Sequence, residues 1–297
     1  MTSLPCKDCV SGTIYDGKPE GEEISLGGRD VYCAPVPELS KGTIVILCDL
    51  FGWKLPNTRL LADAFARDGG YTVLVPDLFP FQPVPFDRLN AFAPLNEKST
   101  PPLLTKIGQT LATIPSLMSF LFQARASVTK KLVASFLEGL EMEGKVFVVG
   151  YCFGGRYALI SGTNVIKEGT VTAVAALHPS LLSLPGDIKH TIVPVSIGVG
   201  TKDDLTTESV VKQLKAEYDA QGSNYELKIY EDMIHGFAVR GNTEDEKVAV
   251  AMADAKIQVS DFELKFNLGL TDRFLNFLIS TSKDVFQYQN TLTARFK

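Results

Sequence analysis

The feature that most constrains this chain is an apolar strand that enters a glycine-rich turn and leaves it as a helix. Residues 146–149 read Val-Phe-Val-Val, and the turn that follows is Gly150-Tyr151-Cys152-Phe153-Gly154-Gly155. In a G-x-S-x-G turn, strain lifts the central side chain above the sheet, and small flanking residues let neighbouring backbones pass. Cys152 holds the central position, where the dipole of the following helix favours a thiolate. The pattern therefore predicts Cys152 as a nucleophile.

Two other interpretations of this turn exist. Cysteine is often a small buried hydrophobe and glycines often end strands, so Cys152 has a structural interpretation as well. Glutamine amidotransferase-like folds also place a cysteine on such a turn and follow it with a histidine and a glutamate. The residues downstream of the turn have to distinguish these cases.

Apolar, β-branched runs recur along the chain and alternate with helical patterns. We expect strands over residues 42–47, 71–75, 145–149, 171–177, 192–199 and 225–230. Helical periodicity covers 57–67, which Gly69 and Gly70 end, and 127–141. This order predicts an α/β fold with a mostly parallel central sheet, helices on both faces and a site at the carboxyl ends of the strands.

The chain length favours a single domain. With 297 residues, of which 45% are hydrophobic, one large core can form. We expect a leader at 1–20, a single α/β domain at 21–280 and a tail at 281–297, with an irregular helical insertion around 80–142. Apolar residues at helical spacing in the insertion, among them Ile114 and Met118, predict packing into the core rather than a lid. Near the start, Gly27 and Gly28 predict a hairpin at the antiparallel edge of the sheet.

Charge and cysteine content exclude several classes of protein. A net charge of −5 without a Lys/Arg run argues against a nucleic acid or an anionic membrane as partner. Five cysteines are an odd number in a long chain, so a disulfide framework is not expected and a reducing, cytoplasmic location is. Cys6 and Cys9 form a C-x-x-C without a second pair at zinc spacing, so no metal is expected there.

Three histidines are available to act as a base. His235 follows the last strand pattern and so lies at the same edge of the sheet as Cys152, whereas His190 precedes a strand and His178 suits the wall of a cleft. Asp203 follows the preceding strand closely and is preferred over Asp204 as the carboxylate that orients the base. The chain order nucleophile, acid, histidine is that of the α/β-hydrolase fold.

Backbone groups near the elbow are candidates for an oxyanion hole. The N–H groups of Phe153 and Leu50 are suitably placed at the ends of two neighbouring strands. Asp49 precedes Leu50 and is expected near the sulfur, where it holds the thiol protonated or accepts its proton. The alternative for Asp49 is a turn residue that accepts hydrogen bonds from backbone N–H groups.

Together these segments resemble the dienelactone hydrolase (carboxymethylenebutenolidase) family. The matching stretches are Asp49-Leu50-Phe51-Gly52-Trp53, Pro56-Asn57-Thr58-Arg59, Val75-Pro76-Asp77-Leu78-Phe79, Gly150-Tyr151-Cys152-Phe153-Gly154-Gly155, Lys202-Asp203, and His235-Gly236-Phe237 with Arg240. The resemblance implies a monomeric α/β hydrolase with a Cys152, Asp203 and His235 triad, no metal or other cofactor, and hydrolysis of lactones or small esters. Asp49 stands where bacterial members carry a glutamate that helps to activate the cysteine.

The resemblance also bears on the substrate. Family substrates of the dienelactone type carry a carboxylate that arginines hold, and one of these arginines is absent near Phe81, while Arg240 is available for the other. Phe51, Trp53, Phe79 and Phe81 predict a more apolar pocket. We therefore expect a neutral or aromatic ester or lactone as substrate. Acyl transfer to another acceptor, and a non-catalytic scaffold that binds through residues 80–142, are the competing functions.

Overall fold

The computed structural model of the chain describes residues 11–78, 84–85, 108, 113–115, 118–120, 122–142 and 144–267. Cys6, Cys9 and the tail 281–297 lie outside these residues. The elements are β1 (Glu22–Leu26), β2 (Arg29–Cys33), β3 (Thr43–Leu47), α1 (Pro56–Ala64), the π-helical turn η2 (Phe65–Gly69), β4 (Thr72–Pro76), α3 (Ala126–Glu138), β5 (Val146–Tyr151), α4 (Phe153–Ser161), β6 (Ala173–Leu177), β7 (Val195–Lys202), α5 (Glu208–Gln221), β8 (Tyr225–Ile234), α6 (Phe237–Arg240) and α7 (Glu246–Asn267).

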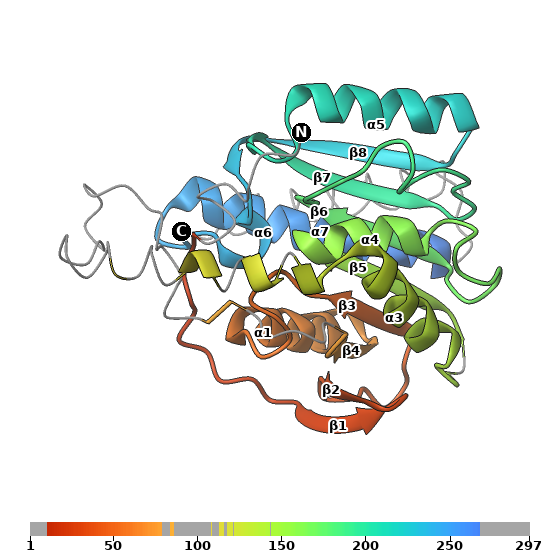
Figure 1. Ribbon diagram of the computed structural model, residues 1–297. Coiled ribbons are helices and arrows are strands. Elements are labelled where there is room, and N and C mark those ends of the chain that lie inside the picture. The colour runs from red at the N-terminus through yellow and green to blue at the C-terminus, as the bar shows by residue number, and fades with distance from the viewer. Residues whose placement is uncertain are drawn as a thin grey trace, which may run out of the picture.

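The strands form one eight-stranded sheet in the order β1-β2-β4-β3-β5-β6-β7-β8. The β1–β2 and β2–β4 pairs are antiparallel and the other pairs are parallel. Helices α3 and α4 cover one face, and α1 and α7 cover the other (Figure 1). The predicted fold class is confirmed. The predicted edge hairpin is confirmed as well, because Gly27 and Gly28 take φ values of 59° and 71°.

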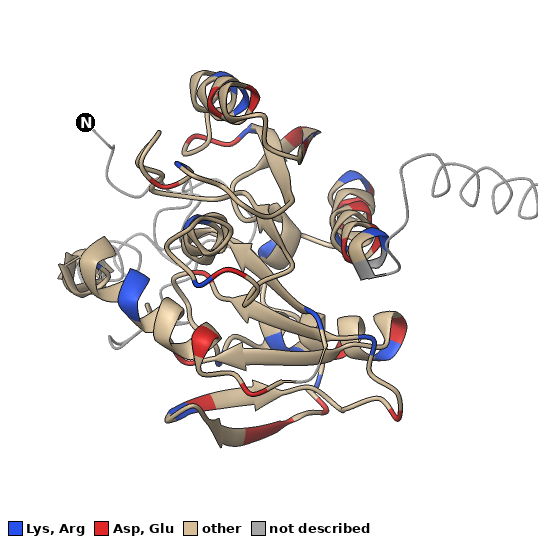
Figure 2. Cartoon of the chain, turned by 90° about the vertical axis from the view of Figure 1, so that its right-hand side faces the viewer, with Lys and Arg blue, Asp and Glu red and all other residues tan. Residues whose placement is uncertain are grey.

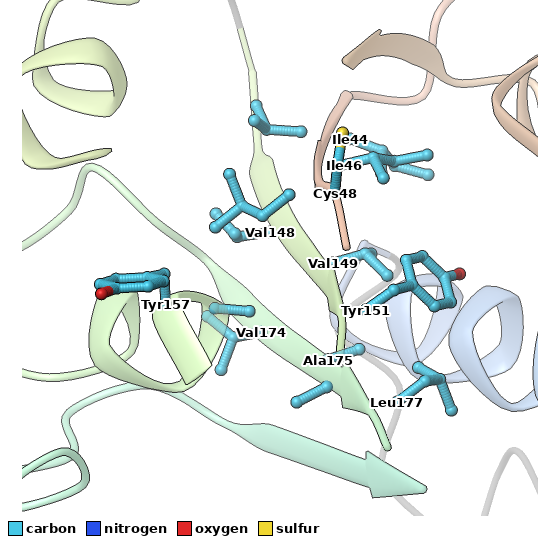
Figure 3. Close-up of a cluster of buried hydrophobic side chains, with 14 of the residues drawn as sticks. Ile44, Ile46, Cys48, Val148, Val149, Tyr151, Tyr157, Val174, Ala175 and Leu177 are labelled. Atoms are coloured by element: carbon cyan, nitrogen blue, oxygen red, sulfur yellow. The ribbon is translucent and has the colours of Figure 1, made fainter. Parts of the chain in front are cut away.

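The core lies on both faces of the central strands β3, β5 and β6, in which every residue is buried. Figure 3 shows how side chains alternate along the strands: Val148 and Val174 point toward Tyr157 of α4, whereas Val149 and Leu177 point to the opposite face. A strand that is covered on both faces can be apolar at every position, which explains the continuous runs in the sequence. This buried centre holds the elbow rigidly.

Charged residues lie on the outer helices, the connecting loops and the edge strands, with both signs interspersed (Figure 2). The central strands carry few of them. Among the described residues, none of the helices is both long enough and apolar enough to cross a membrane.

Two predictions about the connections are wrong. The predicted strand 192–199 begins only at Val195, after Pro194, and both β7 and β8 run farther than expected, to Lys202 and Ile234. They continue because they pair with each other beyond a bulge between Gly200 and Lys202. In addition, residues 178–194 between β6 and β7 form turns instead of a helix.

Two residues of the apolar stripe in the insertion do not pack as predicted, because Ile114 and Met118 are 46% and 52% exposed. The other residues of the stripe, Leu111, Leu117 and Leu121, lie outside the described residues. The insertion is held by Phe120, whose ring contacts that of Phe153 at a centroid distance of 4.9 Å. Part of the insertion thus packs directly on Phe153, the residue that follows Cys152.

Candidate active site

Cys152 lies between the end of β5 and the start of α4 with φ of 53° and ψ of −115°, a conformation that L residues rarely adopt. The positions next to this turn must be glycine, because any side chain there would clash with the neighbouring backbone. A Cβ atom on Gly150 would lie 2.3 Å from the carbonyl oxygen of Gly154, and a Cβ atom on Gly154 would lie 2.0 Å from that of Leu47. The elbow predicted from the sequence is therefore present.

Asp203 and His235 meet because of the strand register. Lys202 of β7 pairs with Ile234 of β8, so the next residue of each strand is placed side by side at the carboxyl end. His235 Nδ1 lies 2.9 Å from Asp203 Oδ2, and both side chains are buried. The other carboxylate oxygen accepts the N–H groups of Leu205 and Thr206 at 2.8 and 3.0 Å, which fixes the carboxylate plane.

The charges of this group favour a proton on the imidazole. Burial alone would raise the pKa of Asp203, but His235 and the two backbone donors lower it below its ordinary value. Burial would lower the pKa of His235, yet Cys152 and Asp203 together raise it well above the ordinary value. Among the described residues, His235 Nε2 has no hydrogen-bond partner of normal geometry, although the Cys152 sulfur is close enough to interact with the ring. The arrangement suits transfer of the thiol proton to His235.

Asp49 occupies the turn position considered for it and also interacts electrostatically with Cys152. Its Oδ1 atom accepts the N–H of Phe51 at 2.9 Å, as a turn residue would, and its Oδ2 atom accepts a hydrogen bond from Arg240 Nε at 2.8 Å. Burial raises the pKa of Asp49, the nearby Arg240 opposes this, and the negative charge of Cys152 adds to the increase. The carboxylate is therefore near the sulfur, but it is engaged by a buried guanidinium.

The turn after β6 holds the backbone of Cys152. His178 Nδ1 accepts the N–H of Cys152 at 3.2 Å, and the Cys152 carbonyl accepts the N–H of Ser180 at 3.0 Å. The His178 ring also contacts that of His235 edge-on, with 5.1 Å between centroids. Burial and the neighbouring His235 lower the pKa of His178 to about 3, so this imidazole is neutral. His178 thus forms a wall of the site.

Ser180 was missed by the sequence analysis. Its hydroxyl oxygen lies 3.6 Å from the Cys152 sulfur, and the residue is buried. A signal was available, because Ser180 comes three residues after Leu177, where β6 ends directly beside the elbow strand. Short polar residues at such a position can reach the nucleophile, but nothing in the local sequence separates them from ordinary turn residues.

The remaining predicted residues lie around this centre. Leu50 follows β3 in a loop that the close approach of Gly154 to Leu47 places beside the elbow, and Phe153 is the first residue of α4. Phe51 is buried beneath the guanidinium of Arg240, with 5.2 Å to the ring centroid. Trp53 is buried against Arg59 of α1. Phe79 and Phe81 lie outside the described residues.

The described residues contain no cluster of three or more His, Cys, Asp or Glu side chains that could hold a metal ion. What they contain at the carboxyl ends of β5, β7 and β8 is a sulfur on a strained turn and a buried imidazole bonded to a carboxylate. This arrangement on this sheet defines an α/β hydrolase.

Comparison with known proteins gives the family. The family model described as "Dienelactone hydrolase family" matches residues 30–263, and the chain belongs to this family of hydrolases that act on ester bonds. Hydrolase pyvD of Aspergillus violaceofuscus is 30% identical over 251 residues, which cover 81% of this chain and 88% of that protein. The carboxymethylenebutenolidase homolog of Mus musculus is 30% identical over 248 residues, 80% of this chain and 86% of that one.

A solved structure agrees on the fold. The dienelactone hydrolase from Anabaena variabilis superposes with a TM-score of 0.53 at 14% sequence identity, over 81% of this chain and 96% of that chain. At this level of identity the likeness concerns the fold alone.

Proposed function

We propose that this protein hydrolyses a small neutral or aromatic ester or lactone by covalent catalysis, with Cys152 as nucleophile. His235 acts as the general base, Asp203 orients it, and the N–H groups of Phe153 and Leu50 stabilise the oxyanion. The observation that carries the proposal is the 2.9 Å contact of His235 with Asp203 next to a cysteine on a strained elbow.

The charges suggest how the steps follow one another. His235 takes the thiol proton, the sulfur attacks the carbonyl carbon, and the proton passes to the leaving alkoxide as the C–O bond breaks. In the thioester the sulfur carries no charge, so one of the causes that raise the pKa of His235 is lost. The neutral imidazole can then remove a proton from the attacking water. The C–S bond breaks, and the thiolate recovers a proton from His235.

The preference for a neutral substrate rests on Arg240. Its guanidinium is 2.8 Å from Asp49 and buried, so its charge is balanced within the protein and is not directed at a substrate carboxylate. Phe51 and Trp53 lie in the same loop and support an apolar pocket. A carboxylate-bearing lactone would enter without a matching cation from Arg240.

The decisive experiment compares the wild type with Cys152→Ala on a panel of p-nitrophenyl esters and neutral and acidic lactones. We expect Cys152→Ala to lose turnover, and the wild type to show a higher kcat/KM on neutral members of the panel. Cys33→Ala is the matched control, because it removes another buried thiol from β2, away from the site. Full turnover by Cys152→Ala would refute the proposal, and a product esterified to another acceptor would indicate an acyltransferase.

A trapped intermediate gives a second test. Mass spectrometry of His235→Ala after mixing with an activated ester should find an acyl group on the peptide that contains Cys152, because hydrolysis of the thioester lacks its base. An acyl group on any other residue would contradict the role of Cys152.

The setting of the enzyme is part of the proposal. Cys33, Cys48 and Cys152 are free thiols among the described residues, which supports a reducing compartment such as the cytoplasm. We also propose that the protein acts as a monomer on a small molecule, without a nucleic acid, a membrane or a cofactor. The mixed surface charge supports this proposal.

A further inference from the structure

The Cys152 sulfur lies in an environment that disfavours its negative charge. The buried carboxylate of Asp49 is close enough that the charge of Cys152 raises its pKa, so a thiolate and this carboxylate repel each other. The start of α4 and His235 offset this repulsion while His235 is protonated. A hydrogen-bond donor that stays next to the sulfur throughout the reaction would stabilise the thiolate, both when it forms and when it leaves the thioester.

The hydroxyl of Ser180 meets this requirement. Its oxygen is 3.6 Å from the sulfur and, among the described residues, the sulfur is its only hydrogen-bond partner. A hydroxyl proton rotates freely, so Ser180 can accept from the thiol and donate to the thiolate without moving its heavy atoms. Hydrogen bonds to a charged form favour that form and lower the pKa of an acid.

The turn around Ser180 is fixed on three sides. Its N–H is bonded to the Cys152 carbonyl at 3.0 Å. The carbonyl of Pro179 accepts a hydrogen bond from the Thr206 hydroxyl, next to Asp203. A Cβ atom on Gly155 would come within 3.0 Å of Pro179, so the turn packs tightly on α4. These contacts hold the hydroxyl at a constant place relative to the sulfur.

We infer that Ser180 is a positioning residue, whose hydroxyl holds the Cys152 sulfur and donates a hydrogen bond to the thiolate as the nucleophile forms and as it leaves the thioester. This inference rests on the proposed role of Cys152. It assigns to the β6–β7 turn a part in the reaction that is separate from those of His235 and Asp203.

The test is Ser180→Ala, which keeps the backbone bonds of the turn and removes only the hydroxyl. We expect the thiol pKa of Cys152 to rise by about one unit, measured from the pH dependence of its alkylation by iodoacetamide on the peptide that contains it. We also expect kcat to fall about tenfold with little change in KM, and the rate profile to shift to higher pH. Ser180→Thr keeps the hydroxyl and should restore the thiol pKa.

Ser161→Ala is the matched control, because Ser161 is also buried and, within the described part of the chain, its hydroxyl donates a hydrogen bond only inside α4, to the Tyr157 carbonyl at 2.7 Å. This variant should leave the thiol pKa and the pH profile unchanged. An unchanged thiol pKa in Ser180→Ala, or an equal shift in Ser161→Ala, would overturn the inference. The alkylation measurement needs no turnover, so this result differs from failure of the proposed function, which would show as activity in Cys152→Ala.

Discussion

Single residues at the site act through their neighbours. His235 and His178 are both buried and lie 5.1 Å apart, yet their pKa values move in opposite directions. At His235 the charges of Cys152 and Asp203 outweigh the effect of burial, whereas at His178 burial and the neighbouring His235 outweigh the smaller effects of Cys152 and Asp203. The same side chain is therefore charged in one place and neutral in the other.

The pKa of His235 should fall when Cys152 is replaced. Cys152→Ala removes one of the charges that raise the pKa of His235, and Asp203→Asn removes another. NMR titration of the histidine side chains should show a lower midpoint for His235 in either variant and the wild-type midpoint in Cys33→Ala. A midpoint that stays the same in Cys152→Ala would mean that the sulfur and the imidazole do not interact.

The residues of the candidate site were accessible to sequence analysis to different degrees. Cys152 stands in a turn whose glycines are required by close packing, and Asp203 and His235 follow strand patterns, so all three could be predicted. The structure places Asp203 next to His235, and the catalytic roles of the three residues stay a proposal. Ser180 also follows a strand pattern, but nothing in the local sequence singles it out, because its closeness to the sulfur depends on the turn that replaces a helix after β6. The pairing of Asp49 with Arg240 joins residues that are 191 positions apart and has no local signature.

Secondary-structure elements set the geometry of the site through close packing and register. The order of strands and helices followed from hydrophobic periodicity, which is a local property. The extension of β7 and β8 to Lys202 and Ile234 did not, because it arises from pairing between the two strands. That extension brings Asp203 next to His235, so the part of the fold that was not predicted is the part that aligns the carboxylate with the imidazole.

Gly154→Ala should disrupt the elbow. The new Cβ atom would lie 2.0 Å from the Leu47 carbonyl oxygen and 2.5 Å from that of Cys48, and neither backbone atom can move aside easily. We expect a loss of about 1–3 kcal/mol or more in the free energy of unfolding and loss of esterase activity. Urea denaturation measures the first quantity.

Gly186→Ala is the control for this variant, because the one described atom that its Cβ would meet is the Ser183 carbonyl oxygen, at 3.5 Å. It should keep both stability and activity. Equal stability of the Gly154 and Gly186 variants would show that α4 is not packed tightly against β3.

At the scale of the whole molecule, buried charges connect distant segments. Arg240 of α6 donates to Asp49 after β3 and to the Ser11 carbonyl, and its own carbonyl accepts the N–H of Thr13 at 2.9 Å. The N-terminal segment, the loop after β3 and α6 thus meet at one side chain. The predicted limits of the leader and of the tail stay predictions.

Arg240→Met should therefore destabilise the whole fold. It leaves the Asp49 carboxylate buried without its cation, which costs about 3–5 kcal/mol. Urea denaturation of Arg240→Met, Asp49→Asn and the double variant forms a cycle, and the double variant should recover part of the loss. Strictly additive losses would mean that the two side chains are not coupled.

Substitution of Glu263 on α7 should stabilise the fold, in contrast to substitution of Arg240. Neither of its carboxylate oxygens has a hydrogen-bond partner among the described residues, and burial raises its pKa well above the ordinary value. The folded state then binds a proton that the unfolded chain releases above its ordinary pKa, so stability falls as pH rises until the folded pKa is passed. Glu263→Met should gain about 1–3 kcal/mol, with a larger gain at pH about 8 than at pH about 5.

Thermal unfolding at the two pH values measures this gain. Glu263→Gln is the control, since it removes the ionisation but keeps the buried polar atoms, and it should lose the pH dependence with a smaller gain in stability. A Glu263→Met variant that is less stable at both pH values would show that the carboxyl group has a stabilising partner.

The burial of Cys152 has a kinetic consequence. Cys152 is only 1% exposed, so we expect a reagent in solution to reach the sulfur only when the chain around it opens transiently. As the reagent concentration increases, the rate of labelling should reach a limit that is the same for fast and slow electrophiles, because opening of the protein is then the slow step. This limiting rate equals the rate at which the chain around Cys152 opens, and it sets an upper limit on the turnover of any ester substrate.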